Sequence, residues 1–144
     1  MKDFNYSSLD DGTIKITKYV VSANIDIPSV INGKNVTTID DGAFERCDTL
    51  ESITIPNSVT TIGNNAFFNC ASLKSATIPD SVTKIGHTAF GNCESLESVT
   101  IPYSVTTIGN YAFGYYWSID NRRRKVKKIS HILLQGHRRR KICC

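Results

Sequence analysis

Three of the five cysteines recur at 23-residue intervals, as Cys47, Cys70 and Cys93. Zinc ligands usually occur in pairs with about two to four residues between them, and no histidine completes such a pair here. In a fold that stacks equivalent residues, the three side chains would point in parallel directions, which disfavours a disulfide bond. The spacing therefore predicts small apolar side chains that fill a core, and no metal site.

Basic residues and the other two cysteines follow residue 121. Ten lysines and arginines lie within 122–128 and 138–141, and Cys143 and Cys144 end the sequence. Such a segment can bind the phosphates of nucleic acid or of an anionic membrane, and a lipidated cysteine would add a second membrane signal. However, Lys141 occupies the position where a prenylation motif requires cysteine. Because arginine-rich sequence without acidic residues builds no core, we expect 121–144 to be a disordered tail, or a weakly helical one over 125–134.

The three histidines, His87, His131 and His137, are isolated in the sequence. We find no Ser-His-Asp or Cys-His arrangement, no paired carboxylates and no glycine-rich phosphate loop. The sequence therefore predicts no catalytic residue, no cofactor and no small-molecule substrate, and the protein is not expected to be an enzyme. His87 is expected to be an exposed residue in a loop.

Charge is divided unevenly along the 144 residues, although the whole chain has a net charge of only +4. Residues 1–121 contain 7 basic and 13 acidic side chains and so have a net charge of −6, whereas residues 122–144 have a net charge of +10. No run of about 18 apolar residues predicts a membrane-spanning helix, and the first residues lack the apolar stretch of a signal peptide. The sequence alone indicates a cytoplasmic protein, or one whose leader is missing.

A 23-residue period accounts for most of the chain and for the elements that must position any binding surface. The recurring residues are Val36, Val59, Val82 and Val105; Ile39, Ile62, Ile85 and Ile108; Phe44, Phe67, Phe90 and Phe113, each after alanine; Leu50, Leu73 and Leu96; and Ile55, Ile78 and Ile101, each before proline. A fixed period of this length is typical of a solenoid, in which each unit buries its apolar face only against its neighbours. Equivalent phenylalanines are then expected in one continuous column.

Each coil is expected to contain three segments. The Ser-Ile-Thr-Ile stretch before proline alternates β-branched residues and predicts a short strand. Val-Thr-Thr-Ile predicts a second, shorter strand, followed by Gly63, Gly86 or Gly109, which we expect to permit a turn. Ala-Phe-x-x-Cys has the spacing of one helical turn. The predicted fold is a solenoid, mainly β, with short helical turns.

The repeats also set the domain boundaries. Full units span 36–58, 59–81 and 82–104, and a partial unit spans 105–120. Residues 1–35 form an irregular opening unit, in which 13–17 alternate like a strand, 24–29 match the later strands and 31–35 have the composition of a turn insertion. No further strand is recognisable after residue 120. The solenoid domain is therefore predicted to cover 1–120, and the basic tail 121–144.

The string Leu73-x-x-Ala76-x-Ile78-x-x-Ser81-Val82-x-x-Ile85 resembles the leucine-rich-repeat pattern. Extended through Ala89-Phe90 to Cys93, it resembles the BspA-like leucine-rich-repeat family, and the likeness covers about residues 4–120. The resemblance implies a right-handed coil of about four to five units. It also implies a cell-surface protein that binds other proteins, such as host or extracellular-matrix proteins. The resemblance thus indicates the cell surface, whereas the sequence alone indicates the cytoplasm.

Outward-facing residues of the strands before proline are the candidate protein-binding surface. They are Ser52, Thr54 and Asn57, then Ser75, Thr77 and Asp80, then Ser98, Thr100 and Tyr103, with Phe68 and 115–117 as further exposed candidates. Short hydroxyl side chains lose little entropy on binding, and tyrosine is enriched at interface hot spots. We therefore expect a non-catalytic protein-binding or adhesion module. Two alternatives stay open: binding of nucleic acid or anionic membrane through the tail, and a truncated repeat fragment without a dedicated partner.

Overall fold

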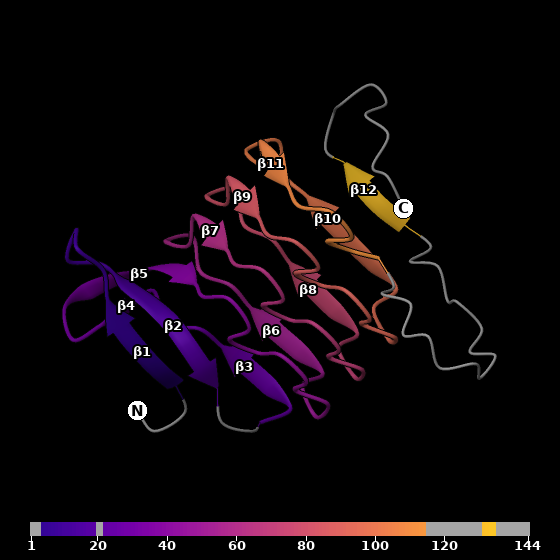
Figure 1. The fold of residues 1–144 in the computed structure, drawn as a ribbon, viewed down its shortest axis with the longest axis horizontal. Helices are drawn as coiled ribbons and strands as arrows, with labels where there is room; N and C mark the ends of the chain where they lie inside the picture. The colour runs from indigo at the N-terminus through magenta and orange to yellow at the C-terminus, as the bar shows by residue number, and fades with distance from the viewer. Residues whose placement is uncertain (1–3, 20–21, 115–130, 135–144) are drawn as a thin grey trace.

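The protein forms a stack of coils that contribute strands to two sheets (Figure 1). The computed structural model describes residues 4–19, 22–114 and 131–134. The strands are β1 (Phe4–Ser8), β2 (Ile14–Tyr19), β3 (Asn24–Asp26), β4 (Val30–Ile31), β5 (Lys34–Ile39), β6 (Ser52–Thr54), β7 (Thr61–Ile62), β8 (Ser75–Thr77), β9 (Lys84–Ile85), β10 (Ser98–Ile101), β11 (Thr107–Ile108) and β12 (His131–Leu134). The predicted β solenoid is confirmed, and none of the described residues is helical.

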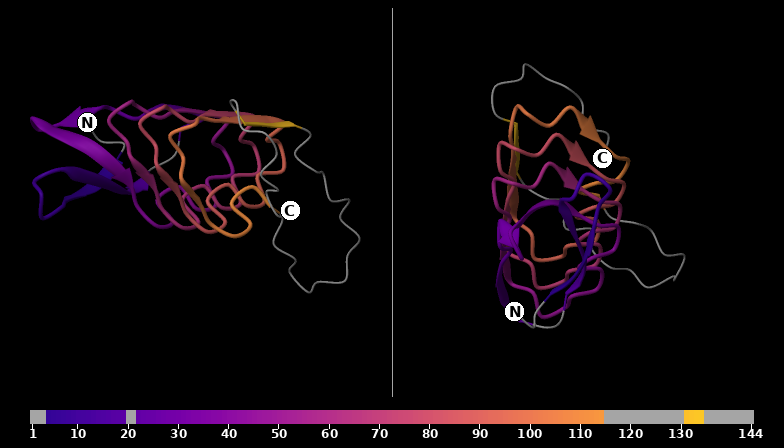
Figure 2. Two further views of the ribbon diagram at one scale, coloured as in Figure 1. Left: turned by 90° about the horizontal axis from the view of Figure 1, so that it is seen from above. Right: turned by 90° about the vertical axis from the view of Figure 1, so that its left-hand side faces the viewer.

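Equivalent strands of successive coils pair in parallel ladders. The first sheet has the order β1-β2-β5-β7-β9-β11, with β4 paired to β5, and the second has the order β3-β6-β8-β10-β12. In the second sheet Ser75 is the register partner of both Ser52 and Ser98, so each strand advances the ladder by one 23-residue unit. Both strands that the repeat predicts are therefore present, and they lie on different sides of the coil (Figure 2).

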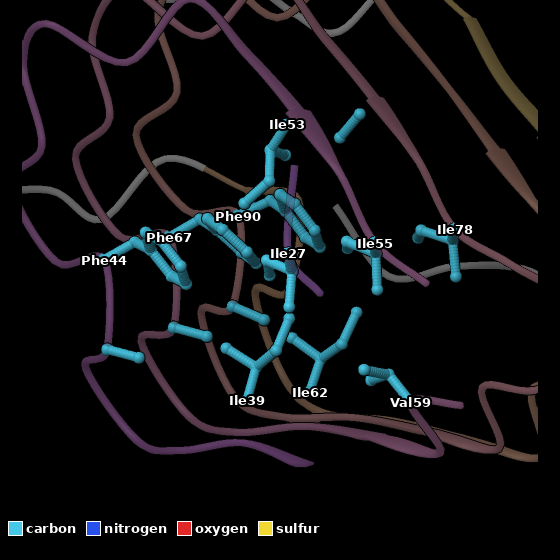
Figure 3. Packing of buried hydrophobic residues seen from close by; sticks show 14 of the residues in the cluster. Ile27, Ile39, Phe44, Ile53, Ile55, Val59, Ile62, Phe67, Ile78 and Phe90 are labelled. Atoms are coloured by element: carbon cyan, nitrogen blue, oxygen red, sulfur yellow. The ribbon is translucent and has the colours of Figure 1, made fainter. Parts of the chain in front are cut away.

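The predicted phenylalanine column forms the centre of the core (Figure 3). The rings of Phe44 and Phe67 stack with their centroids 4.9 Å apart. The separation is 4.8 Å between Phe67 and Phe90, and 5.4 Å between Phe90 and Phe113. The first three side chains are fully buried, whereas Phe113, at the C-terminal end of the column, is 8% exposed. Stacking of equivalent residues from successive coils therefore builds the core.

The Ala-Phe-x-x-Cys segments form tight turns instead of the predicted helical turn. In the first unit alternate N–H groups donate to carbonyls of the next coil, in the pairs Gly42–Asn64, Phe44–Ala66 and Arg46–Phe68, over 2.7–2.9 Å. The N–H groups between them bond three residues back, and left-handed residues such as Arg46 (φ 58°) permit the alternation. A helix would direct every N–H along its own axis, so these bonds between coils exclude one. The turns thus form a third ladder along the stack.

Gly63, Gly86 and Gly109 lie where successive coils approach closely. A β-carbon on Gly86 would lie 2.5 Å from the main-chain nitrogen of Asn64 in the preceding coil, well inside van der Waals contact. None of the three has a left-handed φ, so the predicted role in permitting a turn is wrong, and the close approach is what requires glycine. In the first unit Asp40 occupies this position against the irregular opening coil.

The opening unit is a coil with two additions. β2 and β3 pair with β5 and β6, which confirms the strands predicted at 13–17 and 24–29. β1 lies antiparallel to β2 and continues the first sheet by one strand. The insertion at 31–35 is the turn of a hairpin between β4 and β5, in which Asn32 (φ 50°) and Gly33 (φ 75°) supply the two positive φ angles of a type I′ turn.

The second sheet continues beyond residue 121. β12 is parallel to β10, and Ile132 is the register partner of Val99. The chain uses 33 residues to pass from Ser98 to its partner His131, whereas 23 separate Ser75 from Ser98. The expectation that no strand follows residue 120 is therefore wrong, as is a helix over 131–134. The rest of the predicted tail, including Cys143 and Cys144, lies outside the described residues.

Candidate functional site

The outer face of the second sheet carries two columns of short hydroxyl side chains. Ser52, Ser75 and Ser98 form one column in direct register, and Thr54, Thr77 and Thr100 form the other. Ser52 and Thr100 are half-buried and the other four are exposed. The residues between the columns, such as Ile53 and Val99, point inward and are buried. Neighbouring strands lie about 4.8 Å apart, so the hydroxyls recur at that interval along the stack.

A third column follows the prolines that end these strands. Asn57 and Asp80 are exposed, and Tyr103 is 58% exposed. The structure therefore brings all nine residues of the predicted binding surface onto one side of the stack. Tyr103 is the large aromatic side chain among them and stands towards the C-terminal end.

Charged residues border the hydroxyl columns. The ammonium of Lys74 lies 2.6 Å from the Glu51 carboxylate, and Glu97 holds the equivalent position in the next unit. On the N-terminal side Asp26 is the register partner of Thr54, and Ser52 donates a hydrogen bond to the Asn24 side-chain oxygen over 2.6 Å. The surface is thus polar with an acidic border.

A threonine column beside the first sheet has a different role. Thr60, Thr83 and Thr106 each donate a side-chain hydrogen bond to the main-chain carbonyl of the equivalent residue one coil earlier, over 3.3 Å. These hydroxyls satisfy the protein's own main chain. None of these threonines was predicted in the binding surface, but the repeat pattern alone does not show that their hydroxyls bond to the protein's own main chain.

Two residues outside the sheets were expected to be exposed. Phe68 is half-buried, and a β-carbon on Gly91 in the next coil would lie 3.2 Å from its ring, so the expectation is wrong for Phe68. His87 is exposed as predicted, and its ring lies edge-on to Tyr111 with centroids 6.1 Å apart. The aromatic residues at 115–117 lie outside the described part of the chain.

The repeated cysteines belong to the core, as predicted. Cys70 and Cys93 are buried, and Cys47, in the first unit, is half-buried. Burial raises the pKa of Cys47 to about 11. The neighbouring thiol of Cys93, together with burial, raises the pKa of Cys70. Because a thiolate is the reactive form, Cys47 and Cys70 are poor nucleophiles at neutral pH.

Other parts of the molecule offer less to a ligand. A hollow of about 410 Å³ lies at the first turn segment, lined by Thr17, Lys18, Gly42, Ala43, Glu45, Arg46 and Cys47, none of which belongs to the second sheet. Within the described ranges, no three histidine, cysteine, aspartate or glutamate residues gather where they could hold a metal ion. The same residues form no helix with the length and apolar character needed to span a bilayer.

Comparison with known families agrees with this architecture. The family model described as BspA type leucine rich repeat region, with six copies, matches residues 3–134. The chain belongs to the BspA-type leucine-rich-repeat family. The match extends beyond residue 120, where β12 continues the second sheet. No curated protein is significantly similar to the chain.

Solved leucine-rich-repeat structures share the fold. A leucine-rich repeat protein from Bacteroides capillosus is 27% identical, with a TM-score of 0.78 over 94% of this BspA-type chain and 96% of that protein. The T. pallidum leucine rich repeat protein is 30% identical, with a TM-score of 0.64 over 78% of this chain and 64% of that one. A leucine rich cell surface protein from Faecalibacterium prausnitzii is 32% identical, with a TM-score of 0.65 over 80% of this chain and 41% of that protein. The chain thus spans less than two thirds of the last two proteins.

Proposed function

We propose that this BspA-type chain is a non-catalytic, adhesion-type protein-binding module that binds its partner on the outer face of the second sheet. One observation carries the proposal: the columns that begin at Ser52, Thr54 and Asn57 run in register along one side of the stack to Ser98, Thr100 and the exposed Tyr103. Such a face offers hydrogen-bonding groups at a constant interval on a sheet whose strands are paired in register. A preorganised surface loses less conformational entropy on association.

The relatives support an extracellular setting for this function. The Faecalibacterium prausnitzii protein is described as a cell surface protein, and the shared fold is a repeat module typical of protein interaction. We therefore propose host or extracellular-matrix proteins as the class of partner. The basic segment after residue 121 supplies a second candidate, because its net charge of +10 suits nucleic acid or anionic membrane.

Binding of the full-length chain to purified fibronectin, laminin and fibrinogen, measured by biolayer interferometry, tests the proposal. Thr77→Glu places a charge in the middle of the hydroxyl columns, where interface cores are depleted of charge, and we expect it to weaken binding by at least about tenfold. Tyr103→Ala should weaken it by a similar factor. The matched control is Thr61→Glu in the first sheet, where the register partner Lys84 can pair with the new carboxylate.

A triple variant of the basic segment, Arg122→Gln, Arg123→Gln and Arg124→Gln, separates the two candidates. The proposal predicts unchanged binding in this variant and in Thr61→Glu. If none of the matrix proteins binds, or if the triple variant loses binding while Thr77→Glu keeps it, the outer face is not the binding surface. Binding of the wild-type chain to duplex DNA or to anionic lipid vesicles that weakens strongly with salt would then identify phosphate binding by the basic segment.

A further inference from the structure

The two sheets end at different strands on the N-terminal side of the stack. The first sheet ends at β1, one strand beyond β2, whereas the second sheet ends at β3, which belongs to the same coil as β2. The second sheet therefore has no described strand that pairs with the outer side of β3, whereas β1 pairs with the outer side of β2 in the first sheet. Among the described residues, the second sheet therefore ends in an open edge at β3.

The hydrogen bonds between β3 and β6 show which main-chain groups face this open position. The Ala23 carbonyl accepts from the Ser52 N–H over 3.1 Å, and the Ile27 N–H donates to the Thr54 carbonyl over 3.0 Å. Main-chain groups of successive strand residues point to opposite sides in a ladder. Since residues 23 and 27 point towards β6, residues 24 and 26 point away from it.

Asn24 and Asp26 thus present their main-chain groups to the open position. The Asn24 carbonyl already accepts a hydrogen bond from the Ser22 hydroxyl over 3.2 Å. The N–H groups of Asn24 and Asp26 and the Asp26 carbonyl form the rest of the edge. An edge of this kind is a template for strand addition, in which main-chain hydrogen bonds supply affinity and side chains supply selectivity.

The outermost strand of the first sheet is a poorer template. The register of β1 against β2 shifts between Asn5 and Tyr6, and the side-chain amide of Asn32 donates to the Tyr6 hydroxyl over 2.7 Å. A bulge bends a strand and interrupts its ladder, which is one way proteins protect a sheet edge. The register of β3 against β6 has no such shift.

The side chains of β3 define what an added strand must carry. The exposed carboxylate of Asp26 would lie beside one side chain of the new strand, and the buried Ile25 beside the next. Opposite charges on neighbouring strands stabilise their pairing, and like charges oppose it. A β-branched residue suits the position beside Ile25. Asp26 therefore rejects acidic strands and favours basic ones, as does the net charge of −6 on residues 1–121.

We propose that the β3 edge captures an extended, basic segment of a protein partner by strand addition, with a β-branched residue beside Ile25 and a lysine or arginine beside Asp26. This goes beyond the proposed function, because it uses the edge of the second sheet and not its outer face. Thr77→Glu, which tests the outer face, leaves this edge unchanged.

The probe is a fluorescent synthetic peptide with the sequence of residues 122–129, in which Lys125-Val126-Lys127 has the basic, β-branched, basic order. The full-length chain is titrated into it at low salt, up to about 1 mM protein, and anisotropy is measured. We expect saturable binding. Amide hydrogen exchange followed by NMR should slow at Asn24 and Asp26, whose N–H groups acquire acceptors.

Charge exchange supplies the decisive comparison. Asp26→Lys should weaken binding by at least about tenfold, and a peptide carrying Lys125→Glu and Lys127→Glu should bind this variant better than it binds the wild type. Asp48→Lys is the matched control, because Asp48 is an exposed carboxylate in a turn outside both sheets and its replacement changes the net charge equally. This control should keep the wild-type affinity. A peptide with Val126→Pro should bind weakly, since proline interrupts a ladder.

Absence of binding at about 1 mM would overturn the proposal. So would equal losses in Asp26→Lys and Asp48→Lys, or undiminished affinity of the proline peptide, because each would show general charge attraction without strand addition. Should Asp26→Lys fail to fold, as judged by circular dichroism, Asp26→Ser removes the charge alone. It is expected to weaken binding by a smaller factor, and unchanged affinity in that variant would also count against the proposal.

Discussion

The thiol of Cys93 donates a hydrogen bond to the main-chain carbonyl oxygen of Phe67, one coil earlier, over 3.2 Å. Cys70 and Phe44 make the same contact at 3.1 Å. The cysteine thus fills the core and also joins its coil to the preceding one. The first unit follows an opening coil without this turn, and there Cys47 is half-buried.

This relationship predicts unequal effects of removing the thiols. Cys93→Ala removes a buried sulfur and its hydrogen bond, and should lower the free energy of unfolding by about 1–2 kcal/mol. Cys47→Ala should change it by less than about 0.5 kcal/mol, because the side chain is only half-buried. Urea unfolding followed by circular dichroism measures both. Equal losses in the two variants would mean that the contact with Phe67 contributes nothing.

The same burial predicts a loss of stability in alkali. The pKa of Cys47 is about 11 in the folded protein, above its ordinary value near 9. Between these pH values the unfolded chain releases a proton that the folded chain keeps, so stability is complete below about pH 9 and falls as the pH rises to 11. Urea midpoints at pH 8, 9, 10 and 11 test this. Cys47→Ala should show a shallower decline than the wild type, and parallel curves would argue against it.

The glycines at the coil contacts predict a difference between two similar substitutions. In Gly86→Ala the new methyl group meets main-chain atoms of Gly63 and Asn64 at 2.5–2.6 Å, and main chain cannot move without separating the coils. In Gly91→Ala the nearest atoms are the Phe68 ring, the Thr88 β-carbon and the Thr88 carbonyl oxygen, all at 3.2 Å, so each has to shift by only a few tenths of an ångström. We expect Gly86→Ala to lower the free energy of unfolding by more than about 3 kcal/mol and Gly91→Ala to lower it by about 1 kcal/mol. Thermal unfolding of the two proteins side by side should rank them in that order.

The order of the strands and the core residues could be predicted from the repeat itself. A 23-residue period aligns phenylalanine with phenylalanine, and stacking the coils then buries these side chains in one column, in which Phe67 lies between Phe44 and Phe90. The alternation in Ser-Ile-Thr-Ile likewise fixes which side chains point outward, because strand side chains alternate between faces. The geometry of the candidate surface therefore follows from local pattern, although its partner does not.

The features that escaped prediction depend on contacts between coils. Ala-Phe-x-x-Cys fits a helical period, but the Phe44 N–H bonds to Ala66 in the next coil, and no sequence period reveals that choice. Gly86 is a residue type common in turns, yet glycine is required there because the main chain of Asn64 leaves no room for a β-carbon. The sequence did not predict β12, because 33 residues separate it from the equivalent position in β10, whereas the repeat has 23. Ile132 therefore lies ten residues beyond the position at which the repeat predicts a strand.

The phenylalanine column predicts a gradient of stability along the stack. Phe67 is fully buried between two stacked rings, and Phe67→Ala should lower the free energy of unfolding by about 3–5 kcal/mol. Among the described residues, Phe113 stacks on one ring only and is 8% exposed, so Phe113→Ala should cost clearly less. Chemical denaturation of both variants compares them. A larger loss at Phe113 would show that the column does not stabilise the protein through stacking on both sides.

Thr88 combines two features that seldom occur together: it is 2% exposed, and its φ of 48° is left-handed although its side chain is β-branched. The equivalent positions are also left-handed, and two of them hold Gly42 and Asn65, whose residue types adopt this conformation more readily, whereas the third holds Tyr111 (φ 54°). The Thr88 hydroxyl donates to the Asn65 side-chain oxygen, a bond that an amide could also make. Thr88→Asn should therefore raise the free energy of unfolding by about 1 kcal/mol, and Asn65→Thr should lower it by a similar amount. Urea unfolding decides the matter: a less stable Thr88→Asn protein would mean that packing around the threonine methyl outweighs the backbone strain.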